Sequence, residues 1–99
     1  MQREPLRVLL IEHEAAFANT VSAMLGLHRE TIGDVTCTSS LDEGLAKLGK
    51  ERFDIVILEF FLPDGAGLAN IALLKAQQSR MPLLVLGDSD DETVAISTA

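Results

Sequence analysis

The sequence predicts an α/β fold in which a parallel sheet carries helices on both faces. Apolar runs of four or five residues, which suit strands buried on both sides, alternate with segments in which apolar residues recur at helical spacing. The connections are short, and crossovers between parallel strands are almost always right-handed. A chain of 99 residues therefore predicts one small domain with one site at most.

The first predicted unit is a strand at residues 7–11 (RVLLI) followed by a helix. The strand ends in three polar residues, after which the apolar positions of the helix recur three or four residues apart. The inner face of this helix is predicted to carry Phe17, Val21, Met24 and Leu25.

The second predicted unit begins with a strand at residues 34–38 (DVTCT), which is rich in β-branched residues. Ser40, with Glu43 three positions later, forms a capping-box signature that opens a helix. The inward positions of this helix are Leu41, Leu45 and Leu48.

The third and fourth predicted strands are residues 55–58 (IVIL) and 83–86 (LLVL). A turn through Pro63, Asp64 and Gly65 leads from the third strand into a helix with apolar residues from Leu68 onward. After the fourth strand, a second capping-box signature predicts that another helix begins, with the residues Ser89, Glu92, Val94, Ala95 and Thr98.

Composition and charge limit the classes of binding partner that this domain is expected to have. The formal net charge of -7 would repel phosphate backbones and anionic membrane surfaces, so nucleic-acid or membrane binding by this segment is disfavoured. Cys37 is the sole cysteine, which excludes an intrachain disulfide and fits a reduced setting. The apolar runs are too short to span a bilayer. We expect a cytoplasmic domain whose partners are proteins or cations.

Polar residues follow three of the predicted strands. They are Glu12 and His13 after the first, Glu59 after the third, and Gly87 and Asp88 after the fourth. Ligands gather outside the carboxyl ends of the strands in open parallel sheets, and converging carboxylates suit a hard cation such as Mg²⁺. A single carboxylate there could equally mark where a buried strand meets water. No glycine-rich phosphate loop and no G-x-S-x-G motif is present, which disfavours nucleotide binding and hydrolase chemistry.

Three segments resemble response-regulator receiver domains of bacterial two-component signalling. RVLLIEHEAAFANTVSAML resembles their first strand, acidic pair and first helix, and MPLLVLGDSDDETVAI is similar to their fourth strand. FDIVILEFFLPDGAGL is similar to their third strand and loop, with Glu59 in the place of the phospho-accepting aspartate and Pro63 four positions later. The resemblance covers essentially all 99 residues and implies a flavodoxin-like, doubly wound sheet with strand order 2-1-3-4.

Four departures from the family's pattern bear on function. Glu59 is one methylene longer than aspartate, which misplaces its carboxylate for in-line attack. His13 stands where a second carboxylate would help Glu12 bind Mg²⁺, so Mg²⁺ is expected to bind weakly at most, at Glu12 and Glu59. Gly87 lacks the switch hydroxyl that bonds a phosphoryl oxygen, and the lysine after the fifth strand has no counterpart.

The resemblance and its departures together predict a pseudo-receiver. It would not be an enzyme, would need no cofactor, would not be phosphorylated, and would act through protein–protein contacts with an output domain, a kinase or another regulator. A permanently active state mimicked by Glu59 is the weaker expectation, because one carboxylate charge imitates a phosphoryl group of about -1.5 to -2 only in part.

Two alternatives stay open. An atypical receiver could still bind Mg²⁺ or accept a phosphoryl group at Asp64 or Asp88. A small α/β metal-binding module or enzyme could instead use Glu12, His13 and Glu59, because one imidazole and two carboxylates suit a transition metal. Against the second alternative, adjacent residues at a strand end usually point in different directions, which predicts a solvent-facing or otherwise satisfied His13.

The number of strands sets a further expectation. Receiver domains have five strand–helix units, whereas four strands are predicted here, so residues 1–99 are expected to form a domain truncated before strand five, which a longer polypeptide could supply. The apolar run LLVL would then be an exposed sheet edge, and such edges invite association. We therefore expect low stability, domain swapping or a homodimer formed through the fourth strand.

Overall fold

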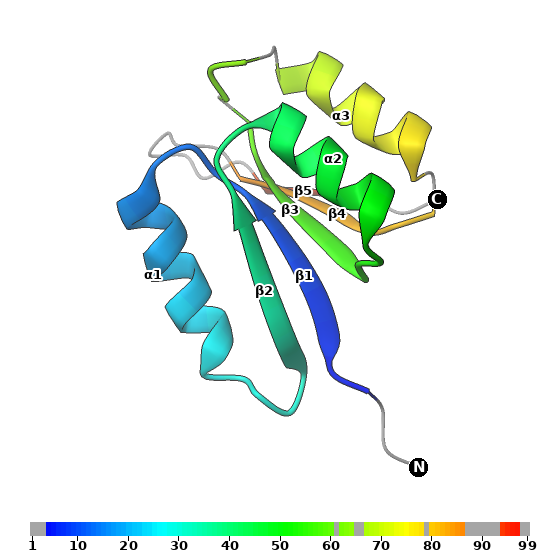
Figure 1. Cartoon of the computed structure of the whole chain (residues 1–99). Helices are drawn as coiled ribbons and strands as arrows, with labels where there is room; N and C mark the ends of the chain where they lie inside the picture. The colour runs from blue at the N-terminus through cyan, green and yellow to red at the C-terminus, as the bar shows by residue number, and fades with distance from the viewer. Residues whose placement is uncertain (1–3, 61, 65–66, 79, 87–93, 98–99) are drawn as a thin grey trace.

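The computed structural model describes residues 4–60, 62–64, 67–78, 80–86 and 94–97. In this part of the chain, strands and helices alternate as predicted up to the fourth strand (Figure 1). The strands are β1 (Leu6–Ile11), β2 (Ile32–Thr38), β3 (Ile55–Glu59), β4 (Leu83–Leu86) and β5 (Val94–Ser97). The helices are α1 (Ala15–Gly26), α2 (Leu41–Lys50) and α3 (Gly67–Gln77).

The strands form one sheet in the order β2-β1-β3-β4-β5, and the first four strands are parallel. The predicted order 2-1-3-4 is confirmed. β1 lies inside the sheet, where Ile11 pairs with Thr38 of β2 and with Leu58 of β3. This register brings the residues that follow Ile11 next to the end of β3.

Residues 94–97 depart from the prediction. They were expected to begin a helix, but they form β5, which runs antiparallel to β4 with Val94 opposite Leu86. The β-branched residues Val94 and Ile96 favour this extended structure. β4 therefore has a neighbour on each side, and the expectation that LLVL is an exposed edge available for a homodimer is wrong. The capping box of Ser89 and Glu92 lies outside the described residues.

The sheet has an apolar cluster on each face because successive strand side chains point to opposite sides. Val8 and Leu10 of β1 face α1, whereas Leu9 and Ile11 face α2 and α3, which cover the other side (Figure 1). The cluster under α2 and α3 is the larger, with Leu9, Ile11, Leu41, Leu48, Phe53, Val56, Leu58, Leu62, Leu74, Leu83 and Val85. The cluster under α1 contains Val8, Leu10, Ala18 and Ile57.

The inner face of α1 differs from the predicted one. Ala18 is buried, with Val21 and Leu25 packed beside it, whereas Phe17 and Met24 are 43% and 60% exposed. The helix has no acidic residue in its first turn and no basic residue in its last turn, so charge does not mark its outer side. Apolar residues on both sides of the helix made the sequence pattern ambiguous.

Helix α2 follows the prediction closely. The Ser40 hydroxyl accepts a hydrogen bond from the Glu43 backbone N–H at 3.2 Å, which confirms the predicted N-cap. Leu41 and Leu48 are buried. Gly44 lies so close to Ile11 that a side chain on Gly44 would overlap it, and the glycine therefore permits close packing of α2 on the end of β1.

Candidate functional site

Glu12 and Glu59 meet at the carboxyl edge of the sheet. Glu12 directly follows the paired residue Ile11 of β1, and Glu59 directly follows its partner Leu58 on β3. Side-chain exposure is only 4% for Glu12 and 6% for Glu59. The register of two neighbouring parallel strands thus places two buried carboxyl groups side by side, as the strand ends predicted.

His13 also turns into this site. Its Nδ1 lies 2.5 Å from Glu59 Oε1 and 3.7 Å from Glu12 Oε2, and its backbone N–H donates to Glu59 Oε1 at 3.0 Å. Glu12 and His13 therefore do not diverge as expected of adjacent residues at a strand end, whereas the hydrogen bonds of His13 to Glu59 agree with the expectation of a satisfied side chain. β1 ends at Ile11, and the chain bends at His13, so the alternation of a regular strand no longer governs these side chains.

Burial raises the pKa of Glu12 from 4.5 to about 7. A side-chain hydrogen bond with Glu59 adds to this rise, since two carboxyl groups in contact hold a proton more tightly than one. The backbone N–H of Glu14 opposes the rise by donating to Glu12 Oε2 at 3.3 Å. Near neutral pH, Glu12 thus spends much of its time protonated and donates a hydrogen bond to Glu59.

The hydrogen bond to Glu59 raises the pKa of His13 above its usual 6.5, and the nearby negative charges act in the same direction. The imidazole remains 37% exposed, whereas both carboxyl groups beneath it are buried. Within the described residues, His13 is the ion-pair partner of both glutamates. The cluster can therefore hold and exchange protons, and His13 lies between it and the solvent.

The same three side chains could hold a metal ion. One ligand atom from each of Glu12, His13 and Glu59 lies within 4.8 Å of the others. Mg²⁺ prefers oxygen ligands in a regular octahedron, whereas one of these three donors is an imidazole nitrogen.

Asp64, in the predicted turn, caps the first turn of α2. Its two carboxylate oxygens accept hydrogen bonds from the backbone N–H groups of Leu41 and Asp42, each at 3.1 Å. These bonds lower the pKa of Asp64 below its usual 3.8. The loop after β3 is thereby tied to the first turn of α2. Because the partners are 22 and 23 positions apart, no local sequence pattern indicates this cap.

Phe60 lies after Glu59 and packs against the larger apolar cluster. Its ring also lies against Gly67 so closely that a side chain on Gly67 would overlap it. Phe60 therefore fixes the start of α3 relative to β3 and contributes packing rather than site chemistry. The predicted site residues Gly65, Gly87 and Asp88 lie outside the described residues.

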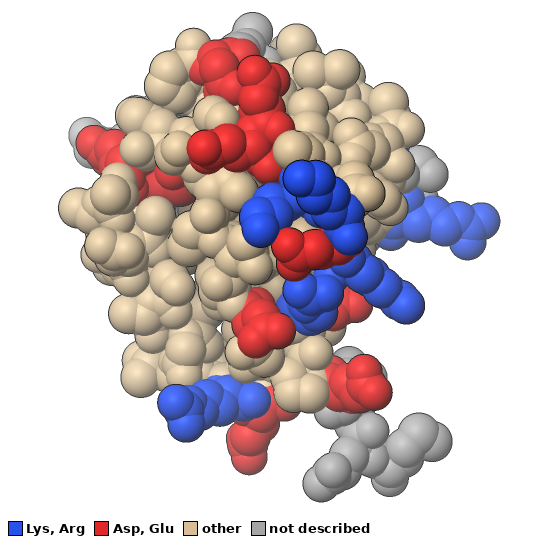
Figure 2. Space-filling model, viewed as in Figure 1, with Lys and Arg blue, Asp and Glu red and all other residues tan. Residues whose placement is uncertain are grey.

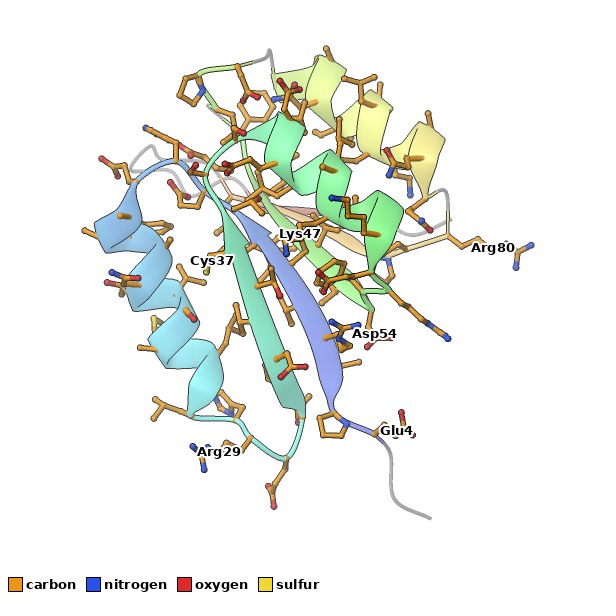
Figure 3. All side chains as sticks on the ribbon, viewed as in Figure 1. Glu4, Arg29, Cys37, Lys47, Asp54 and Arg80 are labelled. Carbon is orange, nitrogen blue, oxygen red and sulfur yellow. The ribbon has the colours of Figure 1, made fainter. Side chains whose placement is uncertain are left out.

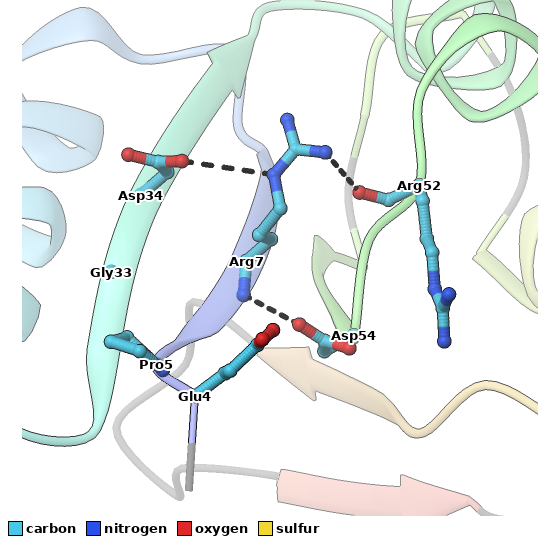
Figure 4. A pocket seen from close by; sticks show the side chains of 7 residues that line it. All are labelled: Glu4, Pro5, Arg7, Gly33, Asp34, Arg52 and Asp54. Carbon is cyan, nitrogen blue, oxygen red and sulfur yellow. Dashed lines mark hydrogen bonds and ion pairs between the residues drawn. The ribbon is translucent and has the colours of Figure 1, made fainter.

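The opposite edge of the sheet carries a pocket of about 440 Å³ around Arg7 (Figure 4). The guanidinium donates to the backbone carbonyl of Arg52 at 2.7 Å and to Glu51 at 3.0 Å, and its Nε lies 3.7 Å from Asp34. The backbone N–H of Arg7 donates to Asp54 at 2.8 Å. No sequence pattern indicated a role for Arg7, because its partners become neighbours only after folding.

Charge is unevenly spread along α2. Its first turn carries Asp42 and Glu43 and its last turn carries Lys47 and Lys50, which complements the helix dipole. Figure 2 shows the basic side chains gathered on one part of this face and acidic ones gathered on another. Figure 3 shows Arg29 and Arg80 extending away from the body of the molecule.

No helix among the described residues is long and apolar enough to cross a membrane.

Comparison with protein families gives one match over nearly the whole chain. The model of the response regulator receiver domain matches residues 8–99. These residues include β3, most of β1 and the loop that contains Pro63 and Asp64.

Curated relatives and solved structures agree with this match. The chain is 31% identical over 94 residues to the cell cycle transcriptional regulator CtrA of Caulobacter vibrioides and 34% identical over 86 residues to the transcriptional regulatory protein TrcR of Mycobacterium tuberculosis. The matches cover 94% and 87% of this chain but only 39% and 32% of those proteins. A receiver domain structure from Methylobacillus flagellatus superimposes with a TM-score of 0.77 at 20% identity, covering 91% of this chain and 75% of that one.

Proposed function

This chain belongs to the family of response regulator receiver domains, and we propose that it keeps the scaffold of that family while Glu59 no longer accepts a phosphoryl group. The domain would then act through contacts with other proteins rather than through phosphotransfer. The observation that carries this proposal is the engagement of the Glu59 carboxyl group by His13 and Glu12 inside a buried site.

Attack on a phosphodonor requires a free carboxylate oxygen aimed in line at phosphorus. Glu59 Oε1 already accepts from both the backbone N–H and the Nδ1 of His13. The Glu59 side chain is also only 6% exposed. An attack by Glu59 would have to break these contacts before the donor could approach.

Phosphotransfer also needs positive charge close to the transferring group. The imidazole of His13 stands where Mg²⁺ would prefer an oxygen ligand, which supports weaker binding of the ion that ordinarily supplies that charge. The mismatch supports the same conclusion as the contacts of Glu59, because the acceptor and its metal site are altered together.

Asp64 is a poor substitute acceptor. Both of its oxygens cap the first turn of α2, and these bonds favour its ionised, hydrogen-bonded state. Phosphorylation at Asp64 would remove two hydrogen bonds from a helix N-terminus. The alternative of an atypical receiver phosphorylated at Asp64 is disfavoured for this reason.

The partners of such a domain would be proteins. The chain spans about two fifths or less of the length of the curated relatives named above, which are transcriptional regulators. We propose that the domain likewise belongs to a regulator with an output domain and contacts that domain or another signalling protein. It would have no enzymatic activity of its own.

The test is an intact-mass measurement of the chain after incubation with Mg²⁺ and a small acyl-phosphate donor. We expect no phosphoryl adduct, because Glu59 is buried and engaged. A receiver domain with an aspartate acceptor, mixed into the same tube, shows that the donor is active. A phosphoryl adduct mapped to Glu59 by fragmentation would overturn the proposal.

A matched variant pair sharpens the result. Glu59→Asp with His13→Asp restores an aspartate and the acidic pair, whereas Glu59→Gln keeps the length of the side chain without its charge. An adduct on the double variant, with none on the original chain or on Glu59→Gln, would trace the loss of phosphotransfer to these two positions.

A further inference from the structure

The carboxyl edge of the sheet places three potential metal donors around one point. Nδ1 of His13 lies 2.5 Å from an oxygen of Glu59 and 3.7 Å from an oxygen of Glu12, and the three ligand atoms lie within 4.8 Å of one another. They come from two adjacent strand ends of the same sheet, so the backbone fixes their relative positions. A site built on rigid elements requires little reorganisation when it binds an ion.

Burial disfavours a net negative charge on this cluster. The carboxyl groups of Glu12 and Glu59 are 4% and 6% exposed, and buried carboxylates are stable only when they are paired or neutralised. Within the described residues, no lysine or arginine forms an ion pair with either of them. Among the residues that the structure describes, His13 is the one cationic partner of these carboxyl groups, and its side chain is 37% exposed to solvent.

The donor set matches late first-row transition ions. One imidazole nitrogen and two carboxylate oxygens suit Zn²⁺, Co²⁺ or Cu²⁺, whereas Mg²⁺ prefers oxygen donors throughout. An ion at about 2.1 Å from each donor holds neighbouring donors roughly 3.4 Å apart. The observed separations of 2.5 Å and 3.7 Å lie on either side of that value, so small side-chain rotations complete the site.

We propose that Glu12, His13 and Glu59 form a binding site for a divalent transition metal ion such as Zn²⁺, with a preference over Mg²⁺ that His13 creates. The ion would replace the proton that now lies between His13 and Glu59, and it would supply the charge that the two buried carboxyl groups lack. This proposal does not depend on whether Glu59 accepts phosphate, since it concerns the donor atoms alone.

The experiment is a calorimetric titration of the 99-residue chain with Zn²⁺, repeated in the presence of excess Mg²⁺, with Co²⁺ absorption as an independent readout. We expect one bound ion per chain, little competition from Mg²⁺, and visible absorption bands that report nitrogen and oxygen ligands. His13→Ala is expected to weaken Zn²⁺ binding by about 100-fold, because it removes one of three donors.

Matched variants identify the source of any binding. His28→Ala removes the other imidazole and Cys37→Ser removes the exposed thiol, and both should leave the Zn²⁺ affinity unchanged. Glu59→Gln, which keeps the side-chain shape, should weaken binding as His13→Ala does. His13→Asp should shift the preference toward Mg²⁺ by about tenfold or more, because all three donors are then oxygens.

Two results would overturn the proposal. The first is the absence of Zn²⁺ and Co²⁺ binding by the folded chain at millimolar ion concentrations. The second is Zn²⁺ binding that survives His13→Ala and Glu59→Gln but is lost in His28→Ala or Cys37→Ser, with circular dichroism showing that every variant is folded. A phosphoryl adduct on Glu59 would contradict the proposed function, whereas the metal proposal is tested separately, by titration of the unphosphorylated chain.

Discussion

The two ends of β1 differ in how their charged side chains are paired. At its beginning, Arg7 is surrounded by acceptors that match it: Asp34, Glu51 and the carbonyl of Arg52, all in a solvent-accessible setting. At its end, Glu12 lies beside Glu59 and both are buried. Within the part of the chain that the structure describes, the partly exposed His13 is their one cationic partner. The sheet edge around Arg7, the balanced edge, thus has charges that match, whereas the carboxyl edge around Glu12 and Glu59, the unbalanced edge, has an excess of acidic groups. The six-residue strand β1 connects the two edges.

This difference separates residues that stabilise the fold from residues that form a candidate functional site. Matched charges at an exposed edge contribute modestly to stability, and salt weakens their contribution by screening. Buried like charges destabilise the fold unless a proton or an ion neutralises them, and such arrangements cluster at functional sites. The carboxyl edge therefore has a chemical reason to bind something that the amino edge lacks.

The largest expected effect comes from neutralising the unbalanced edge. A carboxyl group whose folded-state pKa is raised stabilises the fold below its unfolded pKa, and this contribution is lost as pH rises through the folded pKa. For Glu12 that window runs from 4.5 to about 7. Glu12→Gln should therefore raise the free energy of unfolding by about 2–3 kcal/mol at pH 8 and leave it nearly unchanged at pH 4.5.

Urea unfolding followed by circular dichroism, with a chelator present, measures this difference. Glu14→Gln makes the same change at an exposed neighbouring position and should have little effect. His13, whose pKa is also raised, should leave a smaller decline in stability above pH 6.5 in the Glu12→Gln variant. Equal pH profiles for the original chain and Glu12→Gln would contradict the contrast between the two edges.

The next largest effect on stability is expected from a substitution of Arg7 at the balanced edge. Arg7→Ala removes the hydrogen bonds to Arg52 and Glu51 and the stacking of the guanidinium over the Phe53 ring, whose centroid lies 5.2 Å away. We expect a loss of about 1–2 kcal/mol in the free energy of unfolding, with little change between pH 5 and 8. Arg29→Ala, which truncates a side chain that extends into solvent, is the control and should change stability by less.

The smallest expected effect on stability comes from Asp64, a carboxylate at the carboxyl edge whose two oxygens both accept hydrogen bonds. Asp64→Ala removes two hydrogen bonds from the first turn of α2 and should lower stability by about 0.5–1 kcal/mol at neutral pH. Because the pKa of Asp64 is lowered, its contribution is present above 3.8 and is lost as pH falls below that value. The difference between Asp64→Ala and the original chain should accordingly shrink toward pH 2.

Glu30→Ala provides the matched surface control for Asp64→Ala, since Glu30 is exposed in the turn before β2. Thermal unfolding at pH 7 and pH 2 is a sufficient measurement. If Asp64→Ala and Glu30→Ala lower the melting temperature equally, the bond between the β3 loop and α2 contributes nothing of its own.

The sequence identified what depends on strong local patterns. Runs such as IVIL and LLVL marked the parallel strands, and Ser40 with Glu43 marked the start of α2, because hydrophobic period and capping act over a few residues. The positions of Glu12 and Glu59 beside each other followed from the strand ends and the sheet order.

What the sequence could not predict depends on distant contacts or weak local preference. Val94 and Ile96 suit a strand as well as a helix start, and pairing with β4 decided between them. The turn of His13 toward Glu59 depends on where β1 ends, and Asp64 finds its helix 22 positions back along the chain. The inner face of α1 was ambiguous because apolar residues lie on both of its sides.

The antiparallel β5 also bears on the order in which the sheet assembles. Leu86 and its partner Val94 are 8 positions apart, whereas Ile11 and its partner Leu58 are 47 apart. Closing the shorter loop costs about 1.6 kcal/mol less chain entropy. The β4–β5 pair can therefore form early as a local unit and cover the apolar LLVL run, while the long crossovers that bring Glu12 to Glu59 are still open.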